Sequence, residues 1–299
     1  LMAERIFDEK TLRKLERLTI IANQVRAGAI KGERRSTKRG TSIEFADYRN
    51  YARGDDLRRV DWNIYARLGR AFVKLVEDEE DLAVHLIVDS SASMDWPRGG
   101  ERDQHKFLYA RRLAAGLATI ALSGGDQVTI AALRGDGVET WGPLRGRGRA
   151  LGLLSWLEDR QPGGAIRLND ALAAYARRAA RAGVCIVLSD LMAPEGFADG
   201  LRALQGRGHE LTVIQVLSPD EADPVISGDL KLIDIETGAP QEVTVDAAMK
   251  GLYAQRLATW QAEIGAHCTR RGVHFVPLVT SVPWEQVILM QLRQARVVQ

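Results

Sequence analysis

An aspartate and two serines alternate at one point of this 299-residue sequence, where Asp89, Ser91 and Ser93 directly follow the apolar run Ala83–Val88. One carboxylate and two hydroxyls at alternate positions of a turn can be aimed at a common point. Such all-oxygen surroundings suit a hard cation such as Mg²⁺. The spacing therefore predicts a cation-binding turn at the end of this run.

A second carboxylate occupies the matching place in another apolar run, since Asp190 follows Val184–Leu188 and one serine. If the two runs are neighbouring parallel strands, Asp89 and Asp190 lie on the same rim of the sheet, where ligands bind in such folds. Their two charges would neutralise a divalent ion. No nucleophile accompanies them, so the residues indicate a binding site and not an enzyme.

Two alternatives use the same residues. In the first, Ser91 and Ser93 simply cap the helix that follows them, and Asp190 caps another. In the second, the carboxylates act in a metal-dependent phosphoesterase on a phosphate ester. An aspartyl-nucleophile phosphatase is disfavoured, because Ser91 stands where a second aspartate would act as acid and base.

The elements that must position these residues follow from the order of apolar runs and helical patterns. Alternation of the two is typical of a doubly wound α/β fold, a mostly parallel sheet covered by helices on both faces. The predicted strands are Ala83–Val88, Val128–Leu133, Val184–Leu188, Leu211–Leu217 and Val273–Val279, and the predicted helices are 103–123, 148–158, 168–182, 196–206 and 247–271. An inserted β-hairpin is expected at about 228–246, and a closing helix at Trp284–Val298.

The first 80 residues have a different pattern. Apolar residues recur at helical spacing from Asp8 to about Ala29, and a basic loop and a polar, aromatic stretch follow them. We therefore predict a small N-terminal α+β unit over residues 1–80 and the larger α/β domain over 81–299.

Basic residues gather between Arg26 and Arg39, where six Lys and Arg face a single Glu and give a local charge of +5. Arg34, Arg35, Lys38 and Arg39 form the densest part. Such a stretch is most often a solvated loop, and its functional interpretation is docking to an acidic protein or to nucleic acid. A nucleic-acid-binding adaptor is therefore a further alternative.

Composition limits the other classes of function. With 41 Lys and Arg against 39 Asp and Glu, the net charge is +2, which is too balanced for a general polyanion binder. The two cysteines do not make a disulfide framework, and no apolar stretch approaches the roughly 20 residues that span a bilayer. We expect a cytoplasmic protein with reduced thiols.

A dense run of arginines, aspartates and aromatic residues ends at Trp62. Its core reads R-x-Y-x-x-G-D-D-x-R-x-x-D-W from Arg49 to Trp62, and Asp234-Ile235-Glu236-Thr237-Gly238 and Leu278-Val279-Thr280 continue the pattern. These strings are similar to the signature of domain-of-unknown-function family 58 (DUF58). The D-x-S-x-S turn resembles the metal-ion-dependent adhesion site of von Willebrand factor type A domains. The resemblance covers most of the chain, from about Gly32 to the final helix.

The resemblance implies a von Willebrand type A-like domain after a small family-specific segment. It also implies a role as an adaptor or co-chaperone beside MoxR-type AAA+ ATPases, with no catalytic reaction. The metal residues that it carries over are Asp89, Ser91, Ser93 and Asp190.

One position departs from the family's metal site. A threonine usually supplies another oxygen there, but this chain has Ala165 after Gly163-Gly164. Water can replace one neutral ligand of Mg²⁺, so a weaker, degenerate site is expected. Asn169 or Asp170, about a helical turn away, are candidate substitutes. The five histidines show no ligand spacing, and we predict that His85 is a packed, hydrogen-bonded residue of its strand.

Overall fold

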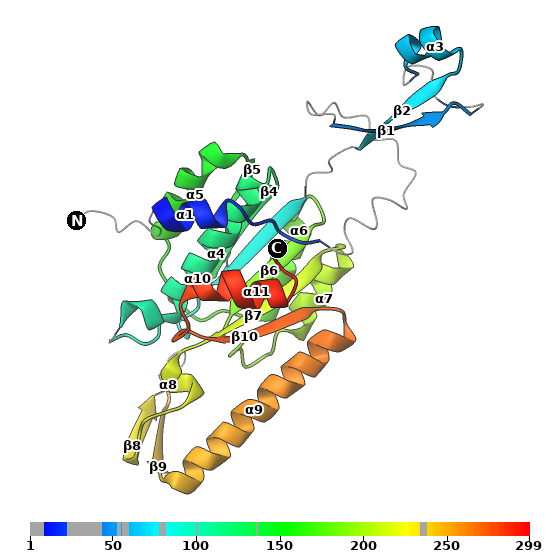
Figure 1. Cartoon of the computed structure of the whole chain (residues 1–299). Helices are drawn as coiled ribbons and strands as arrows, with labels where there is room; N and C mark the ends of the chain where they lie inside the picture. The colour runs from blue at the N-terminus through cyan, green and yellow to red at the C-terminus, as the bar shows by residue number, and fades with distance from the viewer. Residues whose placement is uncertain are drawn as a thin grey trace. The chain divides into compact units, whose positions relative to one another are not determined.

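The computed structural model divides into two compact units (Figure 1). The smaller unit spans Ile30–Asp81, and the larger combines Leu1–Ala29 with Leu82–Gln299. The boundary expected near residue 80 is present, but the assignment of residues 1–29 to the smaller unit is wrong. The structure describes residues 9–22, 44–52, 55, 60–77, 82–99, 101–135, 137–233 and 238–299.

The smaller unit is built on an antiparallel pair of strands, β1 (Glu44–Asn50) and β2 (Phe72–Glu77). Between them lies α3 (Trp62–Leu68), which begins after Asp61. The Asp61 carboxylate accepts hydrogen bonds from the backbone N–H groups of the first helical turn, as expected for an N-cap. The basic residues Arg34, Arg35, Lys38 and Arg39 lie outside the described residues.

A six-stranded sheet forms the centre of the larger unit. Its order is β10-β7-β6-β3-β4-β5, and all neighbours are parallel except β4 and β5. The strands are β3 (Ala83–Asp89), β4 (Gln127–Arg134), β5 (Gly137–Arg145), β6 (Val184–Ser189), β7 (Glu210–Leu217) and β10 (His274–Val279). The predicted mostly parallel sheet is therefore confirmed, with β5 as an additional edge strand.

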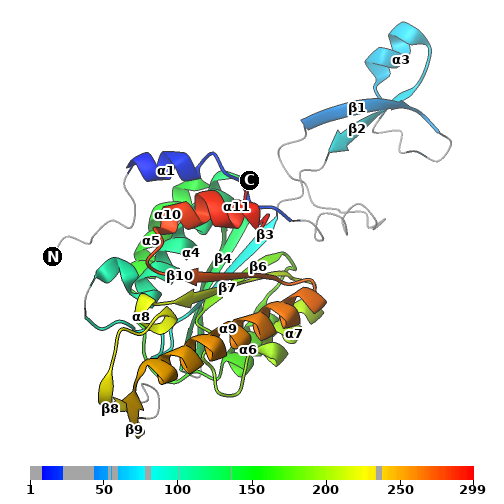
Figure 2. The same ribbon diagram turned by 60° about the horizontal axis from the view of Figure 1, so that its bottom comes forward.

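Helices cover both faces of this sheet (Figure 2). On one face lie α1 (Glu9–Leu15), α4 (Lys106–Ser123), α5 (Ala150–Glu158) and the C-terminal helical segment, which comprises α10 (Trp284–Gln286), η4 (Val287–Gln291) and α11 (Leu292–Gln294). On the other lie α6 (Leu168–Arg178), α7 (Ala198–Gly206) and α9 (Ala247–Arg270). Short 3-10 turns, η2 (Arg102–Gln104) and η3 (Arg147–Arg149), precede α4 and α5.

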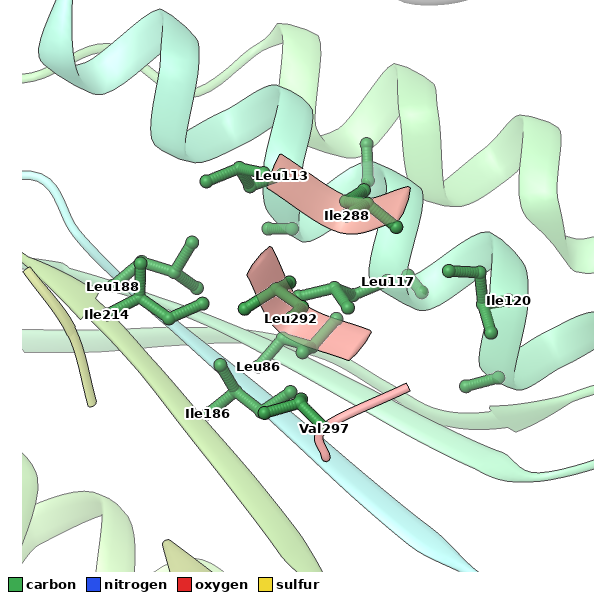
Figure 3. Packing of buried hydrophobic residues seen from close by; sticks show 14 of the residues in the cluster. Leu86, Leu113, Leu117, Ile120, Ile186, Leu188, Ile214, Ile288, Leu292 and Val297 are labelled. Atoms are coloured by element: carbon green, nitrogen blue, oxygen red, sulfur yellow. The ribbon is translucent and has the colours of Figure 1, made fainter. Parts of the chain in front are cut away.

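The two faces carry alternating residues of the same strands, because successive side chains of a strand point to opposite sides. Leu86 of β3 packs beneath α4 and the C-terminal segment, where Leu117 and Leu292 lie (Figure 3). Its neighbour Ile87 joins the opposite cluster with α6 and α7. Both clusters are closed to solvent, so β3 and its neighbours are held rigidly from two sides.

The N-terminal helix is shorter than predicted. It ends at Leu15, and Ile20 instead forms an antiparallel bridge with Val298. Thr19 and Gln299 exchange two backbone hydrogen bonds of 3.0 Å beside this bridge. Beyond Leu15 the described segment up to Ala22 is therefore not helical, and it pairs with the C-terminal residues through this single bridge.

An extension follows β7. It consists of α8 (Pro219–Ala222) and an antiparallel hairpin of β8 (Gly228–Ile233) and β9 (Pro240–Val245), and it leads into α9. The hairpin confirms the predicted insertion at about 228–246. Over the described part of the chain, no helix is both long and apolar enough to cross a membrane.

Candidate functional site

The strand order brings the two predicted carboxylates together. β3 lies beside β6, and the chain leaves β3 toward β4 on one side and leaves β6 toward β7 on the other. A crevice forms at such a switch point, at the carboxyl ends of the strands. Asp89 ends β3 and Asp190 directly follows β6, so both lie on this rim as predicted.

Asp89 is held in one orientation by two donors. Its Oδ1 accepts a 2.9 Å hydrogen bond from the Ser91 N–H, and its Oδ2 accepts a 2.6 Å bond from the Ser189 hydroxyl. Burial, followed by the nearby charge of Asp190, raises the pKa of Asp89 to about 6, although both serine bonds act in the opposite direction. A carboxylate in this position is stabilised by any added positive charge.

The two serine hydroxyls of the turn face each other. Ser91 Oγ and Ser93 Oγ are 2.9 Å apart, and both residues are buried. Between Ser93 and Arg102 no described residue is helical, because the chain continues there as turns and bends. Ser91 and Ser93 therefore do not cap a helix, and this alternative is wrong. Asp190 caps no helix either, since α7 starts only at Ala198.

A fully buried lysine, Lys106, completes the charge arrangement at the rim. Its Nζ lies 2.8 Å from Asp190 Oδ2 and 2.5 Å from Glu221 Oε1. Burial alone would lower the pKa of Lys106, but the two carboxylates outweigh burial and raise it above its usual value. Lys106 is thus a permanent cation inside the site.

Sequence reasoning missed both Lys106 and Glu221. Their separation from Asp190 in the sequence hides the cluster, but one signal was present. Lys106 opens a helix, although the positive end of the helix dipole favours acidic residues there. A lysine at that unfavourable position indicates a buried counter-charge.

The formal charges of the cluster do not balance, because it has more carboxylates than cationic groups. Asp190 and Glu221 pair with the Lys106 ammonium, and Asp89 adds a third carboxylate close to Asp190, which gives a net charge of −2 when all are ionised. Buried charge without a counter-ion is expensive, so this balance favours uptake of a divalent cation or protonation of Asp89. Within the described residues, no group of three His, Cys, Asp or Glu side chains could hold a metal. A cation here would rely on serine hydroxyls and water beside the carboxylate, a donor set that fits Mg²⁺.

The loop that corresponds to the missing threonine lies against the turn. Gly163 N–H donates to Ser90 O and Ala92 N–H donates to Gly164 O, at 2.9 Å each. Ala165 follows at this place and offers no side-chain oxygen. The proposed substitutes serve elsewhere: Asn169 bonds Glu195 and Gly200, and exposed Asp170 pairs with Arg167.

Backbone strain marks the other side of the site. Leu191, directly after Asp190, has φ of 62° and is buried. This left-handed conformation is unfavourable for leucine, by roughly 1–3 kcal/mol. It lets Leu191 N–H donate to Ser189 Oγ and Met192 N–H donate to Asp190 Oδ1, at 3.0 Å each. The strain thus fixes the residues that orient both carboxylates.

His85, in the interior of β3, is a packed residue as predicted. Its Nδ1 lies 2.7 Å from the Tyr175 hydroxyl and its Nε2 lies 3.0 Å from the Arg181 carbonyl. Burial and neighbouring His209 lower the pKa of His85 to about 4, against the Arg181 bond. The ring is therefore neutral in the folded protein at neutral pH.

Because His85 is buried and neutral, we expect its contribution to the free energy of unfolding to fall at acidic pH. In the unfolded chain His85 takes up a proton below about pH 6.5, and the folded protein resists it down to about pH 4, so its stabilising contribution is lost as the pH falls through this window. We expect the stability advantage of the wild type over His85→Gln to shrink by about 2–3 kcal/mol between pH 7.5 and pH 4.5. Urea unfolding of both proteins measures the difference. An advantage that is independent of pH contradicts the neutral, buried ring.

The fold and the site define a doubly wound α/β protein with a carboxylate- and serine-lined rim at its switch point. The chain belongs to the family described as "Protein of unknown function DUF58", whose model matches residues 47–263. Uncharacterised proteins Rv1480 of Mycobacterium tuberculosis and Mb1516 of Mycobacterium bovis are 28% identical over 283 residues, 93% of this chain and 88% of each relative.

Two solved structures are also similar. An aerotolerance-related membrane protein from Bacteroides fragilis matches with a TM-score of 0.42 and 19% identity, over 71% of this chain and 99% of the other. The conserved hypothetical protein BatB from Bacteroides thetaiotaomicron matches with a TM-score of 0.40 and 16% identity, over 72% of this chain and 98% of the other.

Proposed function

We propose that this chain is a non-enzymatic protein-interaction module that binds a partner through a divalent cation at the rim. The observation that supports the proposal is the cluster of buried Asp89, Asp190 and Lys106 with half-buried Glu221, whose formal charges sum to −2. Its position at the switch point, next to the paired hydroxyls of Ser91 and Ser93, offers oxygen ligands where such folds bind ligands.

The residues of the site would have different roles in binding the cation. Asp89, Ser91 and Ser93 would hold the cation, because the two hydroxyls already face each other and Asp89 is aligned by Ser189. Asp190 would contribute charge, since Lys106 and Met192 already engage its two oxygens. When bound, Mg²⁺ supplies a site that attracts an acidic group of a partner. The site is a degenerate metal-ion-dependent adhesion site, because Ala165 contributes no ligand.

The partner that the family resemblance favours is a MoxR-type AAA+ ATPase, with this chain as adaptor or co-chaperone. Affinity capture with tagged wild type and Asp89→Ala tests this. We expect the wild type to capture the ATPase in the presence of Mg²⁺. The captured amount should fall about tenfold with Asp89→Ala or with chelator, because each removes the bound cation. Asp159→Ala, which alters an exposed carboxylate at the end of α5, serves as the control.

Three outcomes contradict the proposal. Equal capture of the ATPase by the wild type and Asp89→Ala would show that the rim does not bind the partner. Mg²⁺-dependent hydrolysis of generic phosphate esters that Asp89→Ala abolishes establishes the phosphoesterase instead. Salt-sensitive binding of nucleic acid that is lost when Arg34, Arg35, Lys38 and Arg39 are neutralised establishes the nucleic-acid adaptor.

A further inference from the structure

The extension after β7 exposes an unusual amount of apolar surface. We call it the arm: α8, the β8–β9 hairpin and the first ten residues of α9, that is the described residues 219–233 and 238–256. Among the described residues, seven of the fourteen exposed large apolar side chains lie in this arm. Six of them are Val225, Ile226, Leu232, Ile233, Met249 and Leu252, with exposures up to 88%. Apolar side chains grouped in this way mark interaction sites more often than singly scattered ones.

The apolar face of α9 extends toward the N-terminus of the helix, beyond the part that packs against the sheet. On α9, Ile264 and Cys268 are buried against the sheet, and Trp260 is half-buried. Toward the N-terminus the same spacing reaches Tyr253 and Met249, which are both exposed. No residue of the first ten in α9 is buried, and Figures 1 and 2 show this end of the helix beside the hairpin, beyond the sheet. Over the first ten of the 24 residues of α9, the described part of the chain therefore does not bury this stripe.

The hairpin is equally uncovered. Only Val245 of its two strands is buried, and Leu232 and Ile233 are open to solvent. An isolated two-stranded hairpin is marginally stable in water and needs a packed face. A partner that covers the arm would supply this face.

The charges of the arm indicate the kind of partner. Over the described arm, residues 219–233 and 238–256, exposed carboxylates outnumber exposed basic side chains by five to two. The carboxylates are Asp220, Asp223, Asp229, Glu242 and Asp246, and the basic residues are Lys231 and Arg256. The whole chain, in contrast, has a net charge of +2. A surface that is locally acidic and apolar is complementary to a basic, apolar one.

The base of the arm is fixed to the rim. Glu221 of α8 binds Lys106, which binds Asp190, and the Tyr253 hydroxyl donates a 2.5 Å hydrogen bond to the Glu221 carbonyl. Glu221 also closes a capping box with Ser218 at the exit of β7. The arm is thus braced at its base and exposed along its length, which is the arrangement expected of a preformed docking element.

We propose that the arm is a docking surface for a basic amphipathic helix of a partner protein. Its apolar side chains would contact the apolar face of that helix, and its carboxylates would pair with the flanking lysines and arginines. The inference rests on the proposed role as an interaction module, and it adds a second contact that requires no cation.

The test uses the whole chain and two synthetic helical peptides as probes, identical in their leucine face but carrying either lysines or glutamates on the polar face. Fluorescence anisotropy is expected to show the lysine peptide binding with a Kd of about 10–100 µM, and the glutamate peptide at least about tenfold more weakly. Ile233→Asp and Leu252→Asp should each raise the Kd of the lysine peptide by about tenfold. The matched control is Leu151→Asp, which alters a side chain of α5 that is 79% exposed and should leave binding unchanged.

Failure of the arm and failure of the rim are separable. Asp89→Ala and chelator should leave peptide binding intact, so their effect on partner capture reports on the rim alone. Equal affinity for both peptides, or full binding by the arm variants, overturns the proposal. Self-association in sedimentation velocity that Leu252→Asp abolishes would assign the arm to a second copy of this chain. Binding to phosphatidylcholine and phosphatidylglycerol vesicles that the same variant abolishes would assign it to a lipid surface, and either result also overturns the proposal.

Discussion

Replacing Lys106 by methionine is expected to lower the free energy of unfolding by about 3–5 kcal/mol, because Asp190 is left buried without its counter-charge. The side chain of Lys106 is wholly buried, so water cannot take over the role of the ammonium. Methionine keeps most of the volume, and the loss therefore reports charge and not a cavity. Urea unfolding at neutral pH measures it.

The double variant Lys106→Met/Asp190→Asn sharpens this experiment. Removing both partners of a buried pair is much less damaging than removing one, so we expect the double variant to recover about half of the loss or more. Mg²⁺ should also stabilise Lys106→Met more than the wild type, because the cluster then carries one more negative charge. A loss below about 1 kcal/mol would show that Lys106 is not the counter-charge of the site.

Asp89→Asn is expected to change the free energy of unfolding in two ways of opposite sign, one without Mg²⁺ and one with it. Without metal at about pH 7.5, the variant should be more stable than the wild type by on the order of 2–3 kcal/mol, since the raised pKa of Asp89 reports a carboxylate that is costly to ionise there. This penalty vanishes as the pH falls below about 4, where Asp89 is protonated in both the folded and the unfolded wild type. The variant therefore gains most at neutral pH.

With Mg²⁺ the stability advantage of Asp89→Asn over the wild type is expected to disappear. A cation at one hundred times its Kd adds about 2.7 kcal/mol to the stability of the protein that binds it, and the Asp89→Asn variant would lack the charge that holds the cation. Thermal unfolding with Mg²⁺ or chelator measures both effects, and Asp159→Asn is the control for an exposed carboxylate. Equal Mg²⁺ stabilisation of Asp89→Asn and the wild type would place the cation elsewhere.

Part of this site was predictable because buried parallel strands leave a strong signal. β3 and β6 are buried over their whole lengths, so their sequences are continuous apolar runs, and the aspartates that follow stand out. Their adjacency then follows from the doubly wound topology. The positions of Asp89, Ser91, Ser93 and Asp190 were therefore predictable from the chain alone.

Other features could not be predicted, because they depend on contacts between distant residues. β5 is an exposed edge strand interrupted by Gly142 and Pro143, so it lacks both an apolar run and a clean alternation. Lys106 meets its counter-charges only in the folded chain. Leu12, Leu15 and Leu18 have helical spacing, and only the pairing of Ile20 with Val298 selects an extended backbone after Leu15.

The pairing of Thr19 and Ile20 with Val298 and Gln299 has a consequence for biosynthesis. The ribosome delivers the N-terminal segment first, but its pairing partners arrive about 280 residues later. The segment 9–22 therefore cannot complete its pairing until Val298 and Gln299 have been synthesised, and the apolar side chains Leu15, Leu18 and Ile20 stay without their final cover until then. During synthesis these residues, and not the rim, are the part of the larger unit that most needs protection from premature association.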